Sequence, residues 1–158
     1  MYRAGHYGVS LLVYAPVLAV LLATGYRAAA VAGLVGVLVL APVPDYDQRV
    51  PFVSHRGPTH TFAFAGLVGA AFAGVVLLAP VEGVARLPLA AFAFGVGALG
   101  IVAHLAGDVL TPAGIEPFWP LSSRNYSLYL TRADNTLANY LVFCCGVAAT
   151  VGVYVLFV

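Results

Sequence analysis

Two histidines and an arginine stand close together in the segment His55-Arg56-Gly57-Pro58-Thr59-His60, in a chain that is 62% hydrophobic and only 8% charged. Imidazole is the commonest protein metal ligand and the usual acid or base near neutral pH. Gly-Pro favours a turn, and threonine is a residue type that caps helices. We therefore predict a reactive loop with two candidate metal ligands, His55 and His60, that leads into an apolar helix capped by Thr59.

Two further motifs carry groups of the same kinds. In His104-x-x-x-Asp108 the two side chains lie one helical turn apart, so both can reach one ion, or the carboxylate can orient the imidazole. Left unpaired inside an apolar run, such a pair would be costly to desolvate. Pro44-Asp45-Tyr46-Asp47 places two carboxylates where they can bracket a divalent cation or position a water molecule. Taken alone, this second motif is more typical of a solvated helix end.

Three more residues have alternatives that the sequence leaves open. Arg56 is suited either to hold an anionic phosphoryl oxygen with two hydrogen bonds or to pair with an aspartate. His6 is either a ligand or an interfacial residue. Asp134, beside Asn135, is either a ligand or part of a helix cap. The predicted metal ligands are His6, Asp45, His55, His60, His104, Asp108 and Asp134, and the predicted catalytic residues are Asp45, Asp47 and Arg56.

Five apolar runs separate these motifs, and the mean hydropathy of the chain is +0.98. They cover residues 9–24, 28–43, 59–78, 87–109 and 136–158. Runs of this length and composition are typical of transmembrane helices. The runs do not alternate between apolar and polar residues with a period of two, so a membrane β-barrel is disfavoured. The sequence predicts an all-α integral membrane bundle of about five transmembrane helices, in a single domain of residues 1–158.

If the helices alternate in direction, all four histidines and four of the six acidic residues fall at one membrane face. The same face receives Arg3, Arg49, Arg56, Arg124 and Arg132, whereas the opposite face receives Arg27, Glu82 and Arg86. The excess of arginine predicts that the polar face and the N-terminus are cytoplasmic. A one-sided cluster also argues against an ion transporter, which needs polar residues across the membrane.

The chain has no lysine and no run of basic residues, so we expect no nucleic acid partner. Neutral imidazoles with carboxylates make zinc the default ion, with manganese or iron as alternatives.

The motifs together resemble the YdjM-type family of membrane proteins regarded as metal-dependent hydrolases. The resemblance rests on Gly5-His6, Pro44-Asp45-Tyr46-Asp47, His55-Arg56-Gly57-Pro58-Thr59-His60-Thr61, His104-Leu105-Ala106-Gly107-Asp108 and the segment 111–120. It extends remotely to the zinc-dependent phospholipases C and the fungal zinc nucleases, which are all-helical enzymes that cleave phosphoesters. Those enzymes bind zinc partly through the amino group of an N-terminal tryptophan, whereas this sequence starts Met1-Tyr2, so we expect one or two ions.

The sequence thus predicts a membrane-bound metal-dependent hydrolase that acts on a phosphoester. An amphiphilic substrate is expected because Trp119, Tyr126 and Tyr129 are suited to a membrane-water boundary, where membrane lipids would be neighbours. The alternative from another class is a non-catalytic membrane scaffold or regulatory protein, in which a metal only joins helices.

Overall fold

A computed structural model describes residues 1–51, 54–80 and 85–158. Within them the chain is helical, with α1 (Arg3–Ala23), α2 (Arg27–Leu40), α3 (Phe62–Leu78), α4 (Arg86–Val109) and α5 (Thr136–Phe157), and these described parts contain no β-strand. Two short 3-10 helices, η1 (Pro44–Arg49) and η2 (Pro58–His60), lie between α2 and α3. The prediction of an all-α bundle is confirmed. Glu82 lies outside the described residues.

The helices have the length that a bilayer requires. Four segments are long and apolar enough to cross a membrane, namely α1, α2 continued through η1, α4 and α5. With 21 residues, α1 is about 32 Å long, which matches a hydrocarbon core of about 30 Å. The 17-residue α3 is at the lower limit of spanning length.

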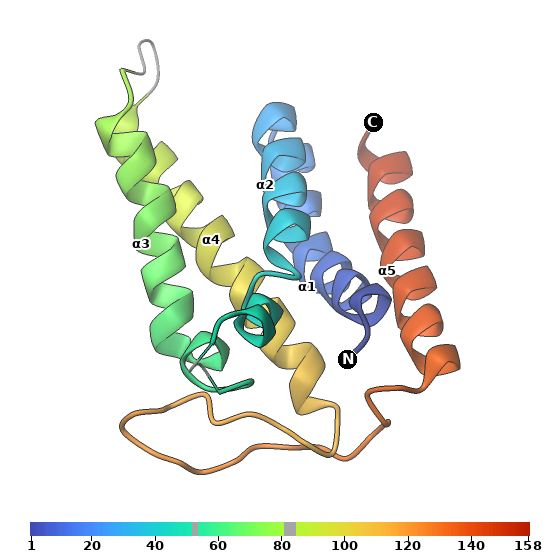
Figure 1. Cartoon of the computed structure of the whole chain (residues 1–158). Coiled ribbons are helices and arrows are strands. Elements are labelled where there is room, and N and C mark those ends of the chain that lie inside the picture. The colour runs from blue at the N-terminus through green and yellow to red at the C-terminus, as the bar shows by residue number, and fades with distance from the viewer. Residues whose placement is uncertain (52–53, 81–84) are drawn as a thin grey trace.

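The bundle is built from two helix pairs, which are joined by α2 and by direct contact between α1 and α4. α1 packs mainly on α5, α3 packs mainly on α4, and α2 contacts both α1 and α4 (Figure 1). Glycines permit the closest approach: a Cβ atom on Gly8 would lie 2.5 Å from the backbone nitrogen of Phe143, and one on Gly146 would lie 2.5 Å from the Gly8 carbonyl oxygen. Small residues allow membrane helices to pack in this way.

Other glycines in these helices differ in how closely they are packed. A Cβ atom on Gly97 would lie 2.9 Å from the Cα of Gly69, so these two glycines bring α3 and α4 together. Gly66 and Gly95, in contrast, face open space. Small size explains some of these glycines, and the others reflect only the composition of membrane helices.

Chain direction brings the polar segments to one end of the bundle. The N-terminus, η1, η2, the end of α4 and the connection from 110 to 135 all lie at the lower end in Figure 1, and the C-terminus lies at the upper end. The loop is held there by backbone hydrogen bonds from Phe62 to Pro117 (2.9 Å) and from Leu128 to Val109 (2.7 Å). Beneath it, Leu40, Ile101 and Leu105 form a buried apolar layer that supports this end.

Two predicted helix starts are displaced. Helix α1 begins at Arg3 rather than near residue 9, so His6 lies within it. Helix α3 begins at Phe62, and its cap is Thr61, whose hydroxyl accepts a hydrogen bond from the Phe64 amide at 3.0 Å. Thr59, the predicted cap, instead donates its hydroxyl to Asp47 at 2.8 Å. Pro58 starts η2, and this short helix moves the entry of α3 three residues along the chain.

Candidate metal centre

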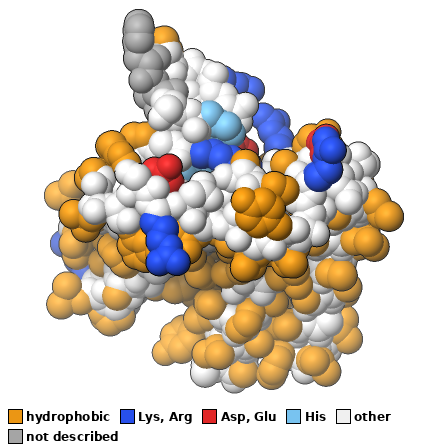
Figure 2. Space-filling view, turned by 90° about the horizontal axis from the view of Figure 1, so that it is seen from below, with side chains coloured by type: hydrophobic (Ala, Val, Ile, Leu, Met, Phe, Trp, Pro, Cys, Tyr) orange, Lys and Arg blue, Asp and Glu red, His pale blue; other side chains and the backbone are white. Residues whose placement is uncertain are grey.

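Four residues from three separate elements meet at the lower end of the bundle. Asp45 comes from η1, His60 from η2, and His104 and Asp108 from the last turns of α4. Each offers a ligand atom within 4.8 Å of the others. Viewed from this end, Figure 2 shows histidine and arginine side chains at the surface of a molecule that is otherwise largely hydrophobic.

Three atoms of this group form a nearly equilateral triangle. His60 Nε2 lies 3.2 Å from His104 Nε2, and Asp108 Oδ2 lies 3.4 Å from each of these nitrogens. Ligands that lie about 2.0 to 2.2 Å from a tetrahedral ion are about 3.3 to 3.6 Å apart. The spacing of these three residues, which we call the inner triad, is therefore that of ligands around one divalent cation.

Hydrogen bonds on the far side of each ring orient the lone pairs of the inner triad. His104 Nδ1 lies 2.6 Å from the Ala41 carbonyl oxygen, which can only accept, so Nδ1 carries the proton and Nε2 a lone pair. The Thr59 hydroxyl donates to Asp47 Oδ2 at 2.8 Å and can therefore accept from His60 Nδ1 at 3.0 Å. This arrangement leaves His60 Nε2 with a lone pair as well. Such outer contacts are typical of metal-bound imidazoles.

Three buried groups that can each bind a cation face one another in the inner triad. The side chains of His60, His104 and Asp108 are 0%, 0% and 1% exposed, so water does not screen their repulsion. Burial lowers the pKa of His60, but hydrogen bonds with Asp108 and Asp45 raise it by more, and the pKa lies above its ordinary value. A proton on His60 Nε2 would face Asp108 Oδ2 at 3.4 Å, an oxygen that has no hydrogen-bond partner when the imidazole is neutral. A metal ion would satisfy all three atoms.

Asp45 is the least buried residue of the cluster. Its Oδ1 lies 3.7 Å from both His60 Nε2 and His104 Nε2, farther than the triad atoms lie from one another. Its side chain is 24% exposed. A carboxylate in this position can either complete a four-ligand shell or lie beside a fourth position that water can enter.

His6 extends the cluster from α1. Its ring is stacked on His104 at 3.8 Å with an interplanar angle of 4°, and Nε2 lies 3.6 Å from Asp108 Oδ1 and 3.9 Å from Asp45 Oδ2. Both ring nitrogens are buried without a hydrogen-bond partner. The Met1 amino group donates to the same Asp108 Oδ1 at 2.7 Å. Gly107 makes room for His6, since a Cβ there would lie 2.9 Å from His6 Nδ1.

A second group, the outer network of Asp47, His55 and Thr59, surrounds His60. Asp47 Oδ1 lies 2.9 Å from His55 Nδ1, while Oδ2 accepts from Thr59 and from the Arg56 amide at 3.1 Å. Asp47, His55 and His60 also have ligand atoms within 4.8 Å of one another. In contrast to the inner triad, each acceptor here has a donor. The outer network is thus complete through hydrogen bonds alone.

Arg56 links the cluster to the loop that follows α4, through hydrogen bonds to Asp108 and Gly114. Its guanidinium donates to Asp108 Oδ1 at 3.1 Å and to the Gly114 carbonyl at 3.0 Å. The residue adopts a φ of 64°, a conformation that side chains other than glycine rarely adopt, and the Asp47 contact with its amide helps to hold it. Of the two alternatives for Arg56, the structure contains the pairing with an aspartate.

Asp134 lies apart from the cluster. Its carboxylate pairs with Arg132 at 3.0 Å, with side chains that are 55% and 80% exposed. Hydrogen bonding and the charge of Arg132 hold the pKa of Asp134 below its ordinary value. Asn135 caps α5 by accepting from the Ala138 amide at 3.1 Å, so this segment has the capping role that the sequence left open.

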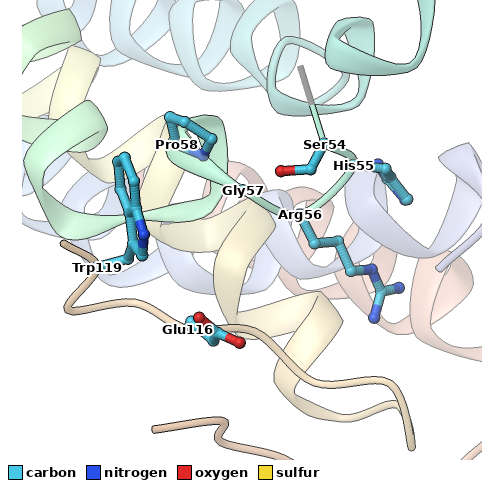
Figure 3. Close-up of a pocket in the computed structure, with 7 residues that line it drawn as sticks. All are labelled: Ser54, His55, Arg56, Gly57, Pro58, Glu116 and Trp119. Atoms are coloured by element: carbon cyan, nitrogen blue, oxygen red, sulfur yellow. The ribbon is translucent and has the colours of Figure 1, made fainter. Parts of the chain in front are cut away.

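A pocket of about 430 Å³ opens beside the outer network (Figure 3). His55, Arg56 and Ser54 line one side, and Pro58, Trp119 and Glu116 line the rest. Trp119 and Tyr129 are 42% and 73% exposed on the loop that covers this end. The predicted aromatic side chains therefore lie at the same end as the cluster.

Three supporting groups were not predicted from the sequence. The Ala41 carbonyl orients His104, and Thr111, which is fully buried, lies 3.4 Å from Arg56. Asn139 of α5 accepts from the Tyr2 amide at 3.0 Å and thereby fixes the segment that leads to His6. A backbone carbonyl cannot be identified from residue type. A lone asparagine in an apolar run was the one usable signal.

A family model described as YdjM inner membrane protein matches residues 1–158, the whole chain. The chain belongs to the YdjM inner membrane protein family. No curated protein and no solved structure matches it. With four helices long enough to span a bilayer, this YdjM family member is a membrane protein with a buried His/Asp cluster that could hold a metal ion.

Proposed function

We propose that this YdjM family member is a membrane-bound, metal-dependent hydrolase that cleaves a phosphoester on an amphiphilic substrate. The observation that carries the proposal is the inner triad, in which three buried ligand atoms lie 3.2 to 3.4 Å apart. Two imidazoles and one carboxylate are a ligand set found in catalytic zinc sites. We propose His60, His104 and Asp108 as the principal ligands.

Zinc is the ion we propose, with manganese or iron as alternatives, because the ligands are nitrogen and oxygen and no thiol is present at the site. We propose a second ion only beside His6 Nε2 and Asp45 Oδ2, which lie 3.9 Å apart, because Asp108 Oδ1 already accepts from the Met1 amino group and from Arg56. The other oxygen of Asp45 faces the two triad histidines. A carboxylate in this position can bridge a pair of ions.

A bound divalent ion acts as a Lewis acid and makes water a usable nucleophile near neutral pH. Asp45 is the carboxylate best placed to orient that water and accept its proton, because it is the exposed member of the cluster. Asp47 acts indirectly, through Thr59 and His60. Arg56 holds Asp108 in place.

The substrate proposal follows from where the cluster lies. Trp119 and Tyr129 are exposed at this end, and aromatic side chains favour the depth of lipid headgroups. A phosphoester of a membrane lipid would therefore be presented at the height of the cluster. We propose that this end, with the N-terminus, faces the cytoplasm, as the arginine distribution predicts.

A structural metal site in a non-catalytic scaffold is the second candidate function. It is favoured if Asp45 completes the shell, because four protein ligands close a zinc site to water. The two functions predict different behaviour of Asp45→Asn. In the hydrolase the variant keeps its metal and loses turnover, whereas in the scaffold it loses metal and thermal stability together.

The test uses purified protein in detergent, with metal content measured by elemental analysis and turnover measured on phosphatidyl lipids and simple phosphodiesters. We expect zinc- or manganese-loaded wild type to hydrolyse a phosphoester and Asp45→Asn to lose that activity. Equal turnover in the two proteins would mean that the activity is a contaminant. A wild type that loses stability with chelator but never turns over substrate would support the scaffold.

A further inference from the structure

A separate pocket of about 420 Å³ opens on the exposed side of Asp45, between the start of α1 and η1. Its lining includes Arg3, Asp45, Tyr46, Gln48 and Arg49. The volume is within the range of small-molecule sites. Of the four residues in the central metal-ligand group, Asp45 is the one that reaches this pocket. A ligand bound here would lie beside the inner triad.

Two guanidinium groups in this pocket have no acidic partner. Among residues 1–51, 54–80 and 85–158, the arginines that form ion pairs are Arg56 and Arg132. Arg49 lies over the Tyr46 ring at 5.5 Å from its centre, which leaves its N–H groups free for a ligand. The chain has only seven arginines, and two of them line this pocket together with a single carboxylate, that of Asp45.

We propose that this pocket binds the phosphate group of the substrate, through Arg3 and Arg49. Guanidinium groups match the oxygens of a phosphate with paired hydrogen bonds. Arg56 is less suited to this role, because its guanidinium is already engaged by Asp108 and Gly114. The proposal rests on the proposed function for the fate of the bound phosphoester, but binding itself requires no turnover.

The pocket also explains how one site can hold both a metal and an anion. Asp45 is the carboxylate that lines the pocket, and its Oδ1 lies 3.7 Å from the two triad histidines. The Asp45 carboxylate therefore faces the inner triad, while Arg3 and Arg49 supply positive charge elsewhere in the pocket lining. A phosphate between them would have one oxygen near the cluster and the others near the guanidinium groups.

The test is a calorimetric titration of metal-loaded protein with inorganic phosphate, glycerol 3-phosphate and dihexanoyl phosphatidic acid. Dihexanoylglycerol serves as the phosphate-free analogue. We compare wild type with Arg3→Gln, Arg49→Gln and the double variant. Arg27→Gln, at the start of α2 and at the opposite end of the bundle, is the matched control. Both pocket arginines are exposed, so the substitutions should leave the fold intact, as circular dichroism would verify.

We expect each single substitution to weaken phosphate binding by about tenfold, as loss of a charge-assisted hydrogen bond predicts, and Arg27→Gln to bind as wild type does. Lysine substitutions should recover part of the affinity, since they restore charge without the planar fork. Tighter binding of phosphatidic acid than of glycerol 3-phosphate would assign the phosphate to a lipid. Equal binding of the two would assign it to a water-soluble phosphoester, and both results support the pocket.

Wild-type affinity in the double variant, or equal binding of dihexanoylglycerol, would overturn the proposal and leave the arginines as membrane anchors. Failure of the proposed function is distinguishable from this result. If the protein never turns over a phosphoester yet its phosphate binding depends on Arg3 and Arg49, the phosphate-binding pocket is supported and the hydrolase function is rejected. If turnover persists at its full rate in the double variant, the hydrolase function is supported and the pocket is rejected as the phosphate site.

Discussion

The inner triad and the outer network contain the same types of side chain but differ in how their hydrogen bonds are balanced. In the outer network, Asp47 receives a donor at each oxygen, from His55 on one side and from Thr59 and Arg56 on the other. In the inner triad, two nitrogen lone pairs and Asp108 Oδ2 converge, and this oxygen has no hydrogen-bond partner. The first group is satisfied by its own hydrogen bonds, whereas the second could hold a metal ion. Residue type alone does not separate a metal site from a polar network.

The largest effect is expected when one imidazole of the inner triad is removed. His104→Ala deletes a ligand that is fully buried and already oriented by the Ala41 carbonyl. We expect stoichiometric metal to be lost, as measured by elemental analysis of purified protein. Retention of wild-type metal content in this variant would show that the triad is not the metal site.

A smaller effect is expected in the outer network. Asp47→Asn keeps the shape of the side chain but disturbs the contact that leads through Thr59 to His60. Loss of such a supporting contact typically reduces metal affinity by about 10- to 100-fold. Competition with a chelator of known affinity would measure the change. Complete loss of metal, as in His104→Ala, would place Asp47 among the ligands and erase the distinction between the two groups.

A proton should compete with the metal at the inner triad. The pKa of His60 lies above its ordinary value because the neighbouring carboxylates raise it by more than burial lowers it. A protonated imidazole cannot bind a metal, so affinity should fall as the pH drops through this pKa and recover above it. Metal titrations at several pH values check this. An affinity independent of pH between 5 and 8 would exclude His60 as a ligand.

Arg56→Lys should affect stability more than metal binding. Lysine keeps one charge near Asp108 but loses the second contact with Gly114. We expect a loss of about 2 kcal/mol in the free energy of unfolding, the typical value for hydrogen bonds to a charged group, with metal content unchanged. Thermal unfolding of the metal-loaded protein provides the measurement. Unchanged unfolding would mean that Arg56 is free to act on the substrate.

The smallest effect is expected at Asp134, which serves as the control for the others. Its carboxylate is 55% exposed and pairs with Arg132, and exposed ion pairs contribute little to stability. Asp134→Asn should therefore leave metal content and unfolding temperature unchanged. A loss of metal in this variant would mean that the connection before α5 rearranges to reach the cluster.

Much of the architecture could be predicted because apolar runs of membrane length leave few alternatives. The expected runs at 87–109 and 136–158 differ from α4 (Arg86–Val109) and α5 (Thr136–Phe157) by one residue at most at each end. The starts of α1 and α3 were less accurate. Helix α1 begins at Arg3, before the expected run at 9–24, and a 3-10 turn and Thr61 decide the start of α3. Helix ends depend on individual hydrogen bonds that composition does not reveal.

The sequence by itself determined that the histidines and most of the acids gather at one membrane face, because alternating helices leave no other topology. It also identified His60, His104 and Asp108 as groups of the right chemistry. Tertiary structure decided which of the predicted residues meet: it brought His6 onto His104, left Asp134 with Arg132 and turned Arg56 toward Asp108. These outcomes depend on ring orientation and on which donor reaches which acceptor. Contacts over less than 4 Å between distant parts of the chain are fixed only when the helices pack.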